Sequence, residues 1–428
     1  MLTKKKFGLI VMMLFVSFAL IGCQDSENGN GEENGYENGN GTVETPPAGE
    51  HSQGVTDSRI YIANSAATSG LLAGVGVPFR AGIEAYLLMV NEGGGIHGRE
   101  IYYLHRDDEF DPINAIAYLE GFIHDDEVFA IVGHFGTPVI AGTFDILLAE
   151  RIPTVYFAAG IGVVYNENAT DGNGRNTFPV QPVFPMEGRI FTAWAAGTFE
   201  AETIGVIFTG DDAGLDFIGG IEQEAATIGG LEIVSAQVEP NAVDVTAQVA
   251  TVLAADPDVV IIGSIQGTLP QIARELANQG NTAPTLTSYV NADISIAAQI
   301  ADDIEGHFDL FASSWVNIDL VTDDYRYWIA RVSDEDFSLN SFAMTGWIAA
   351  HFFMEGLRRT PADNITWENF IEAMEEAPIQ NPFGSVIDFA NGSRVGTQNL
   401  ALVQMDGSAE QGWVPFLDFM GMDEILGQ

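Results

Sequence analysis

The chain has 428 residues, of which 60 are acidic, 16 are basic and one is a cysteine. The formal net charge of −44 repels phosphate backbones, which excludes a nucleic-acid partner. A lone cysteine excludes a disulfide framework and a cysteine-based structural zinc site. The length suits about two to three domains, and 46% hydrophobic residues are enough to build sizeable cores.

Residues 1–22 have the anatomy of a lipoprotein signal peptide. The lysines of the chain all lie at positions 4–6, and an apolar stretch follows that is shorter than the roughly 20 residues of a membrane-spanning helix. This stretch ends in Leu-Ile-Gly-Cys, which resembles a lipobox. Cys23 is therefore predicted to be the lipidated first residue of the mature protein. The alternative is an uncleaved anchor with an incidental cysteine.

Residues 23–57 are rich in glycine, asparagine and glutamate and contain few apolar side chains. Because such a segment cannot offset its ordering entropy, it is predicted to be a disordered acidic tether. A lipid, a tether and a globular body describe an extracytoplasmic protein that is attached to the membrane only through its lipid. Without residues 1–22 the chain keeps 13 arginines, no lysine and 60 acids. This composition predicts salty surroundings, in which ions screen the repulsion between carboxylates.

From Arg59 onward, strand and helix patterns alternate, which predicts an α/β fold with parallel sheets. Strands are predicted at residues 59–63, 100–105, 128–132, 153–157, 203–208, 232–238, 258–262 and 285–287. Helices are predicted at residues 78–91, 214–228, 243–255, 269–279, 323–332, 342–358 and 367–375. Two further helices are expected to begin after cap residues Asp111 and Thr137, each of which precedes a proline. Extended pieces are expected near residues 385–389 and 399–405.

The two halves of the body repeat one pattern. Residues 129–133 and 259–263 are both apolar strands that end in glycine, and a Gly-Thr pair precedes the helix that follows each strand. Three prolines within residues 177–185 mark a crossover between the halves. Two similar lobes that face each other predict a cleft between the carboxyl ends of their sheets, where α/β folds bind ligands.

Two motifs in the first half resemble those of a known family. One is the glycine-rich segment at residues 82–99, and the other is the Asp-Asp…Asp-Pro…Ala segment at residues 107–115. The strand at residues 130–133 and the aromatic-led segment at residues 341–347 agree with them. Over about residues 59–419, the chain resembles the type I extracellular solute-binding proteins of the branched-chain amino acid (Leu/Ile/Val-binding) class, which are the ligand receptors of ABC importers.

This resemblance implies two doubly wound, Rossmann-like lobes joined by a three-crossover hinge, as in type I periplasmic binding proteins. Residues 58–178 plus 314–382 are assigned to lobe 1, and residues 179–313 plus 383–423 to lobe 2. The lobes are expected to close on a small-molecule ligand, and ABC permease subunits are the expected partners.

The loop at residues 133–138 is the most informative candidate site. An apolar strand ends there, a glycine loop turns, and a helix begins at Thr137. Free backbone N–H groups and the helix dipole suit a carboxylate, so Phe135, Gly136 and Thr137 are predicted to contact the ligand. The alternative is an ordinary helix cap. The family resemblance implies that the Thr137 hydroxyl binds the ligand carboxylate.

Two neighbouring loops are further candidates. By resemblance, Ala158 offers a backbone carbonyl to the ligand, whereas Gly160 stands where relatives usually have a hydroxyl residue. Ser69, Leu72 and Val75 lie in a segment that resembles the family's loop after the first strand, with simple loop packing as the alternative.

The second lobe departs further from the family. Tyr289 falls near the position of the carboxylate that pairs with a ligand ammonium, and Phe184 occupies a position often filled by aspartate. A cleft without an ammonium partner does not favour a zwitterion, because an unpaired buried charge is costly. A small carboxylate, an aromatic acid, an amide or a urea-like solute is then as plausible as leucine. Asp211, Asp212 or Asn291 are alternative sources of a polar group.

Phe342 is predicted to pack against the apolar part of the ligand, with helix core as the alternative. The histidine spacings fit no metal site, and nucleophile-elbow, P-loop and dinucleotide-binding motifs are lacking. No catalytic residue, metal or cofactor is therefore predicted. We expect a monomeric, lipid-anchored substrate-binding protein of an ABC importer, which takes a small amino acid or a related carboxylate or amide. A ligand-sensing receptor of the same fold is the main alternative, and a cell-surface hydrolase is the minor one.

Overall fold

The computed structural model describes residues 51–427. The signal peptide, the lipidation site Cys23 and most of the predicted tether therefore lie outside the described residues. The end of the predicted tether, residues 51–57, instead packs on the body. Val55 is fully buried, and the Gln53 side chain donates to the carbonyls of Ile123 and Val128, at 3.1 Å each. The ordered body therefore begins earlier than the sequence predicted.

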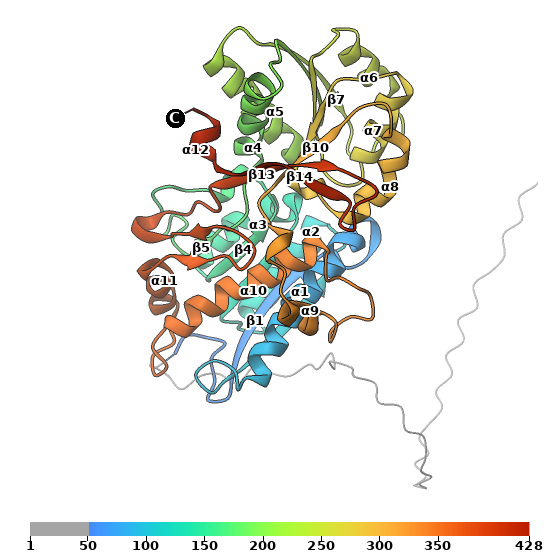
Figure 1. Cartoon of the computed structure of the whole chain (residues 1–428). Coiled ribbons are helices and arrows are strands. Elements are labelled where there is room, and N and C mark those ends of the chain that lie inside the picture. The colour runs from blue at the N-terminus through green and yellow to red at the C-terminus, as the bar shows by residue number, and fades with distance from the viewer. Residues whose placement is uncertain (1–50, 428) are drawn as a thin grey trace, which may run out of the picture. The chain divides into compact units, whose positions relative to one another are not determined.

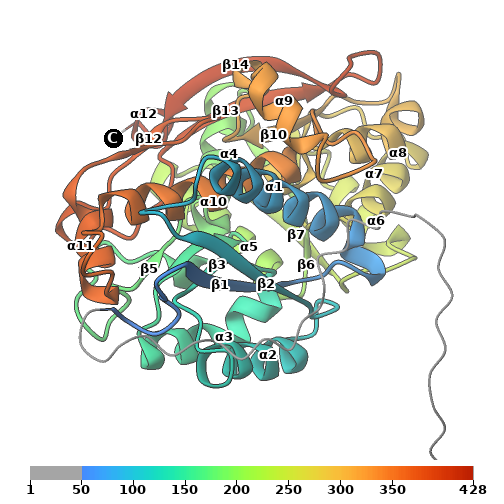
Figure 2. The same ribbon diagram turned by 90° about the horizontal axis from the view of Figure 1, so that it is seen from below.

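The first sheet is parallel and has the strand order β2-β1-β3-β4-β5 (Figure 1). Its strands are β1 (Arg59–Ala66), β2 (Glu100–Asp107), β3 (Ala130–Phe135), β4 (Thr154–Ala158) and β5 (Thr177–Phe178). The helices around it are α1 (Ala73–Glu92), α2 (Pro112–His124), α3 (Thr137–Glu150), α9 (Asp323–Ile329), α10 (Ser341–Arg359) and α11 (Trp367–Glu376). Figure 2 shows α2 and α3 on one face of the sheet, and α1 and α10 on the other. We call this layered unit the first lobe.

Helices α1 and α10 cross closely on that face, because glycines remove the side chains between them. A Cβ on Gly82 would collide with the carbonyl oxygen of Ala343, and one on Gly346 would collide with that of Phe79. Among the described residues, Gly70–Glu92 is the only helix apolar and long enough to cross a membrane, and it includes all of α1. Half of the 18-residue window with the highest hydropathy is buried inside the body.

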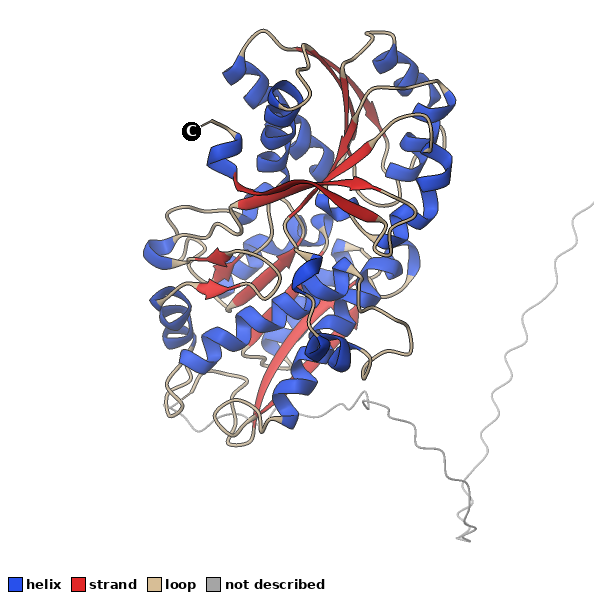
Figure 3. Ribbon diagram, in the orientation of Figure 1, coloured by secondary structure: helices blue, strands red, loops and turns tan. Residues whose placement is uncertain are grey.

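The second sheet has the order β14-β13-β10-β9-β8-β6-β7 (Figure 3). Strands β6 (Thr203–Thr209), β7 (Glu232–Val238), β8 (Val259–Gly263), β9 (Thr285–Thr287) and β10 (Leu310–Ser314) are parallel. The antiparallel pair β13 (Asn399–Met405) and β14 (Trp413–Gly421) extends one edge. The helices are α4 (Phe184–Gly197), α5 (Asp212–Ile228), α6 (Thr246–Leu253), α7 (Leu269–Asn278), α8 (Ile294–Ile304) and α12 (Met422–Ile425). We call this unit the second lobe.

The chain passes between the two sheets at three places (Figure 1). It leaves the first sheet after β5, returns after β10 to form α9 and α10, and leaves again through the short hairpin of β11 (Ile379–Gln380) and β12 (Val386–Ile387) to reach β13. The predicted α/β class with two doubly wound lobes is confirmed. Helices α4 and α8 and strand β14 were not predicted.

Candidate functional site

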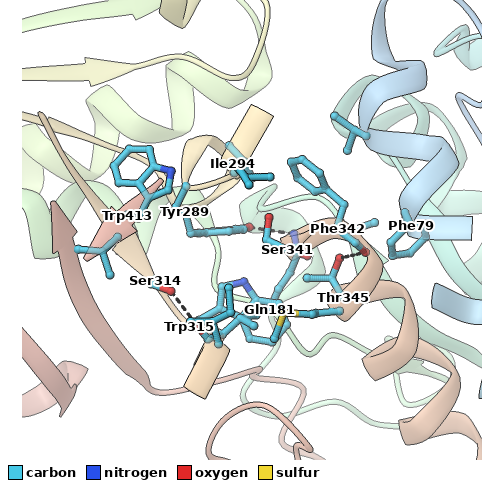
Figure 4. Close-up of a pocket in the computed structure, with 18 of the residues that line it drawn as sticks. Phe79, Gln181, Tyr289, Ile294, Ser314, Trp315, Ser341, Phe342, Thr345 and Trp413 are labelled. Carbon is cyan, nitrogen blue, oxygen red and sulfur yellow. Dashed lines mark hydrogen bonds between the residues drawn. The ribbon is translucent and has the colours of Figure 1, made fainter. Parts of the chain in front are cut away.

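A cavity of about 240 Å³ lies between the lobes (Figure 4). The first lobe lines it with the segments that follow β1, β3 and β4, together with the start of α10. The second lobe lines it with the segments that follow β8, β9 and β10, and with β13 and β14. The carboxyl ends of both sheets therefore meet at one site, as the repeated pattern in the sequence predicts.

Most of the predicted ligand residues line this cavity. They are Leu72, Val75, Phe135, Gly136, Thr137, Ala158, Phe184, Tyr289 and Phe342. Ser69 is exposed and does not belong to the lining, and Gly160 is buried behind it. The lining itself does not show ligand contact, so these assignments remain predictions.

Thr137 is the first residue of α3, and the cap is Gly136. The predicted cap was therefore one residue late. Gly136 has a φ of 98°, which favours glycine, and a Cβ there would lie 2.6 Å from the Phe110 ring. The Thr137 side chain is 5% exposed, and its hydroxyl has no hydrogen-bond partner among the described residues. It faces the cavity beside the unpaired N–H groups of the first helical turn.

The two departures from the family pattern at Gly160 and Phe184 form one contact. A Cβ on Gly160 would lie 2.5 Å from Cδ1 of Phe184, so the ring fills the space of a side chain at position 160. The Phe184 N–H also donates to the Gly160 carbonyl at 2.5 Å. The ring packs 4.6 Å from that of Phe217 and stacks 6.3 Å from that of Tyr289. The Phe184 ring thus occupies the space that a side chain at position 160 would need.

The polar groups of Tyr289 and its neighbour Gln181 are paired within the protein. The Tyr289 hydroxyl donates to the Pro182 carbonyl at 3.0 Å and accepts from Gln181 Nε2 at 2.8 Å. Gln181 Oε1 accepts from the Tyr156 hydroxyl at 2.7 Å. These side chains therefore present mainly apolar surface to the cavity.

The three alternative polar residues do not line the cavity. Asp211 caps α5 by accepting from the Gly214 N–H, and Asp212 is exposed. Asn291 is fully buried; its Nδ2 donates to the Ser264 carbonyl and its Oδ1 accepts from the Gln266 N–H, both at 2.8 Å. None of these side chains is placed to bind a ligand in the cavity.

Glu187 is a buried carboxylate that the sequence reading missed. It accepts from Ser288 Oγ at 2.7 Å, from the Tyr289 N–H at 3.1 Å and from Ser313 Oγ. Burial raises the pKa of this carboxyl to about 7. Glu187 is not part of the lining, and it fixes the backbone of Tyr289 instead. The signal in the sequence is an acid in the first turn of a segment whose only other charged residue is Arg189.

The cavity is aromatic, and its lining includes residues that were not predicted. Phe79, Phe110, Trp315, Trp413 and Phe419 add to the predicted aromatic residues. The only charged residues of the described lining are Asp319 and Asp418, both of which are exposed. Within residues 51–427, His, Cys, Asp and Glu side chains form no group suited to a metal ion.

The comparison with known proteins agrees with this architecture. A family model described as "Periplasmic binding protein" matches residues 59–411. This chain belongs to the periplasmic binding protein family. One relative, the Leu/Ile/Val-binding protein homolog 2 of Brucella abortus (strain 2308), is 23% identical over 258 residues, which are 60% of this chain and 68% of that protein. The predicted resemblance to the branched-chain amino acid class is confirmed.

Two solved structures share the fold of this periplasmic binding protein. A fatty acid ABC transporter substrate-binding protein from Thermomonospora curvata has 19% identity and a TM-score of 0.77, with 90% of this chain and 98% of that chain covered. A branched chain amino acid ABC transporter protein from Thermus thermophilus with bound valine has 17% identity and a TM-score of 0.75, with 86% and 98% covered. The family consists of solute-binding components of transport, so the protein is not an enzyme.

Proposed function

We propose that this periplasmic binding protein is the substrate-binding protein of an ABC importer. It is extracytoplasmic, acts as a monomer, is anchored through a lipid on Cys23, and delivers a small solute to ABC permease subunits. The observation that carries the proposal is the cavity between the lobes, which Thr137 lines at the start of α3. The solute is a small amino acid or a related carboxylate or amide, whose polar end binds at Thr137.

Contacts between the lobes support closure around a solute. The Gly162 N–H in the first lobe donates to Oδ2 of Asp216 in α5 at 2.7 Å. At the start of α10, the N–H and hydroxyl of Ser341 donate to Oδ2 of Asp293, at 3.1 and 2.8 Å. Ser341 also lines the cavity. These bonds join residues of the first lobe to residues of the second lobe.

Isothermal titration tests solute binding. The purified protein is unfolded and refolded to remove bound solute, then titrated with amino acids, carboxylates, amides and urea. We expect heat with one class of solute, and small-angle scattering should show a more compact protein in its presence. The absence of heat with every class would contradict solute binding.

Labelling with a radioactive fatty acid in the producing bacterium tests the anchor separately. The wild-type chain should incorporate label, and the Cys23→Ala variant should not. Equal labelling of the two chains would place the lipid elsewhere and reject the predicted lipobox.

A further inference from the structure

The chemistry of the cavity restricts the solute further than the proposed function does. We propose that the ligand is a monocarboxylic acid with an apolar tail and no ammonium group. This inference rests on the proposed function, because it specifies the solute class of the same site. Three properties of the cavity support it: no buried carboxylate in the described lining, a helix start at Thr137 that can hold one negative group, and an aromatic wall that continues into the second lobe.

A buried ammonium needs a carboxylate or several free carbonyls. The buried carboxylates near the lining are Asp108, Glu187 and Asp293. Asp108 Oδ1 accepts from the Phe110 N–H at 2.9 Å and its Oδ2 has no hydrogen-bond partner among the described residues, but Asp108 is not part of the lining.

Protein donors occupy Glu187 and Asp293. Three donors bind Glu187, while Asp293 accepts from the Ser295 N–H at 2.9 Å and from Ser341. Neither residue belongs to the lining. The carboxylates that do belong to the lining, Asp319 and Asp418, are exposed. An ammonium buried beside Thr137 would therefore find no buried carboxylate in the lining, and an unpaired buried charge is costly.

Two carbonyls beside the Thr137 loop each accept one hydrogen bond from the protein already. The Ala158 carbonyl accepts from the Gly136 N–H at 3.2 Å, and the Gly160 carbonyl accepts from the Phe184 N–H at 2.5 Å. The Phe184 ring fills the space beside Gly160, so a hydroxyl side chain cannot take part there. An ammonium next to the bound carboxylate would meet this ring instead of a negative group.

The start of α3 offers hydrogen-bond donors to the carboxylate of such a ligand. Thr137 is 5% exposed and lines the cavity, and no hydrogen bond joins its hydroxyl to another described residue. Pro138 has no N–H, so Thr137 and Val139 supply the N–H groups of the first turn of α3, a helix of 14 residues. Together with the helix dipole, these donors suit one negative group. Helices α8 and α10 also begin in the lining, but the side chains of Asp293 and Asn340 accept from their first-turn N–H groups. The start of α3 has no such side-chain cap, so it is the helix start that suits a carboxylate best.

The rest of the cavity suits hydrocarbon. Phe342 and Phe79 lie on one side in Figure 4, Tyr289 and Trp315 lie towards the middle, and Trp413 lies on the far side. The lining continues along β13 and β14 through Val403 and Leu417. The polar atom of Trp413 is not available to a ligand, because its Nε1 donates to the Asp293 carbonyl at 3.0 Å. A linear or aryl tail thus extends from Thr137 towards β14.

Matched pairs of ligands that differ only in the amino group test the inference. The refolded protein is titrated with isocaproate against leucine and with hydrocinnamate against phenylalanine. We expect each acid to bind on the order of 10-fold or more tightly than the amino acid with the same skeleton. Tighter binding of the amino acids would overturn the inference and leave the proposed function intact. Binding only of another class of solute would have the same consequence. Binding of no solute at all would overturn both.

The tail path has its own test. Leu417→Asp places a carboxylate on the half-buried far wall, and Leu215→Asp makes the same change at an exposed position outside the lining. We expect Leu417→Asp to weaken octanoate binding on the order of 10-fold while butyrate binding is unchanged, because only the longer chain reaches β14. Leu215→Asp should change neither affinity. Equal losses for octanoate and butyrate would contradict the proposed tail path.

Discussion

The two walls of the cavity use their polar groups differently. The first lobe presents the unpaired Thr137 hydroxyl and the start of α3. In the second lobe, the hydroxyl of Tyr289 and the carboxylates of Glu187 and Asp293 are bonded within the protein. One wall is therefore equipped to recognise a polar group, whereas the polar atoms of the other wall maintain the structure. The difference shows that a polar side chain near a cleft can bind a ligand only if its donor or acceptor atoms are not already used within the protein.

The largest effect is expected from the contact between Gly160 of the first lobe and Phe184 of the second lobe. Phe184→Ala should lower the free energy of unfolding by about 3–5 kcal/mol, because it leaves a cavity among Phe217 and Tyr289. Gly160→Ser should cost about 1–3 kcal/mol through its clash with the ring. Denaturant unfolding measures both, with the more exposed Phe416→Ala as the control.

The double variant shows whether these residues act as one contact. Once the ring is gone, the introduced hydroxymethyl group at position 160 has space. The loss in Phe184→Ala/Gly160→Ser should therefore be smaller than the sum of the single losses. If the losses of unfolding free energy in the two single variants simply add up in the double variant, the residues at positions 160 and 184 do not act as one contact.

Glu187→Gln tests whether the buried carboxyl of the second lobe is structural. Its pKa is raised from 4.5 to about 7, so the folded protein favours the protonated form. The resulting stabilisation is complete below about pH 4.5 and is lost as the pH rises through about 7. Relative to the variant, the wild type should lose up to about 3 kcal/mol of unfolding free energy over this range.

Thermal and denaturant unfolding across pH provide the measurement for Glu187→Gln. The exposed Glu232→Gln variant is the control and should keep the wild-type profile. Solute affinity of Glu187→Gln should stay close to that of the wild type. A large loss of affinity with an unchanged pH profile would assign Glu187 to ligand recognition.

Thr137→Val tests whether the wall of the cavity formed by the first lobe binds the polar end of the solute. Removing a hydroxyl that donates to a carboxylate should cost about 1.5–3 kcal/mol, or about 10- to 100-fold in affinity, with little change in stability. Thr251→Val is a matched control, because this exposed threonine on α6 bonds only to the Ala247 carbonyl among the described residues. Titration calorimetry compares the three proteins. An unchanged affinity in Thr137→Val would show that the hydroxyl does not contact the solute.

Asp216→Ala tests the bond that joins the walls. Loss of the 2.7 Å bond from the Gly162 N–H should weaken solute binding by about 1 kcal/mol, or roughly 5-fold, mainly through faster release from a less stable closed form. Asp212→Ala on the same helix is exposed and serves as the control. Stopped-flow measurement of solute release compares them. Equal rates of solute release from Asp216→Ala and Asp212→Ala would show that the bond between Gly162 and Asp216 does not stabilise the closed form.

Much of the fold followed from the periodicity of apolar residues. The strands at residues 232–238, 285–287 and 399–405 coincide with their predictions. Helix α4 was missed because its buried residues surround most of its circumference and no side chain caps it. Strand β14 was missed because it contains Pro415 and few buried positions, as an edge strand can.

The parts of the candidate site that depend on a short stretch of sequence could be predicted. The glycine loop before Thr137 indicates a helix start after a strand, and this alone places donors at the cleft. Contacts between distant residues were not predictable from one sequence. The Phe184 ring against Gly160, and Glu187 beneath Tyr289, become visible only when the segments are packed together.

The central claim, that one wall binds a carboxylate while neither wall binds an ammonium, is tested most directly by the solute that the protein carries when purified. Native protein from its own cells is denatured, and the released small molecules are identified by mass spectrometry. We predict a nitrogen-free monocarboxylic acid with an apolar tail, in about equimolar amount to the protein. An amino acid in that amount would contradict the claim.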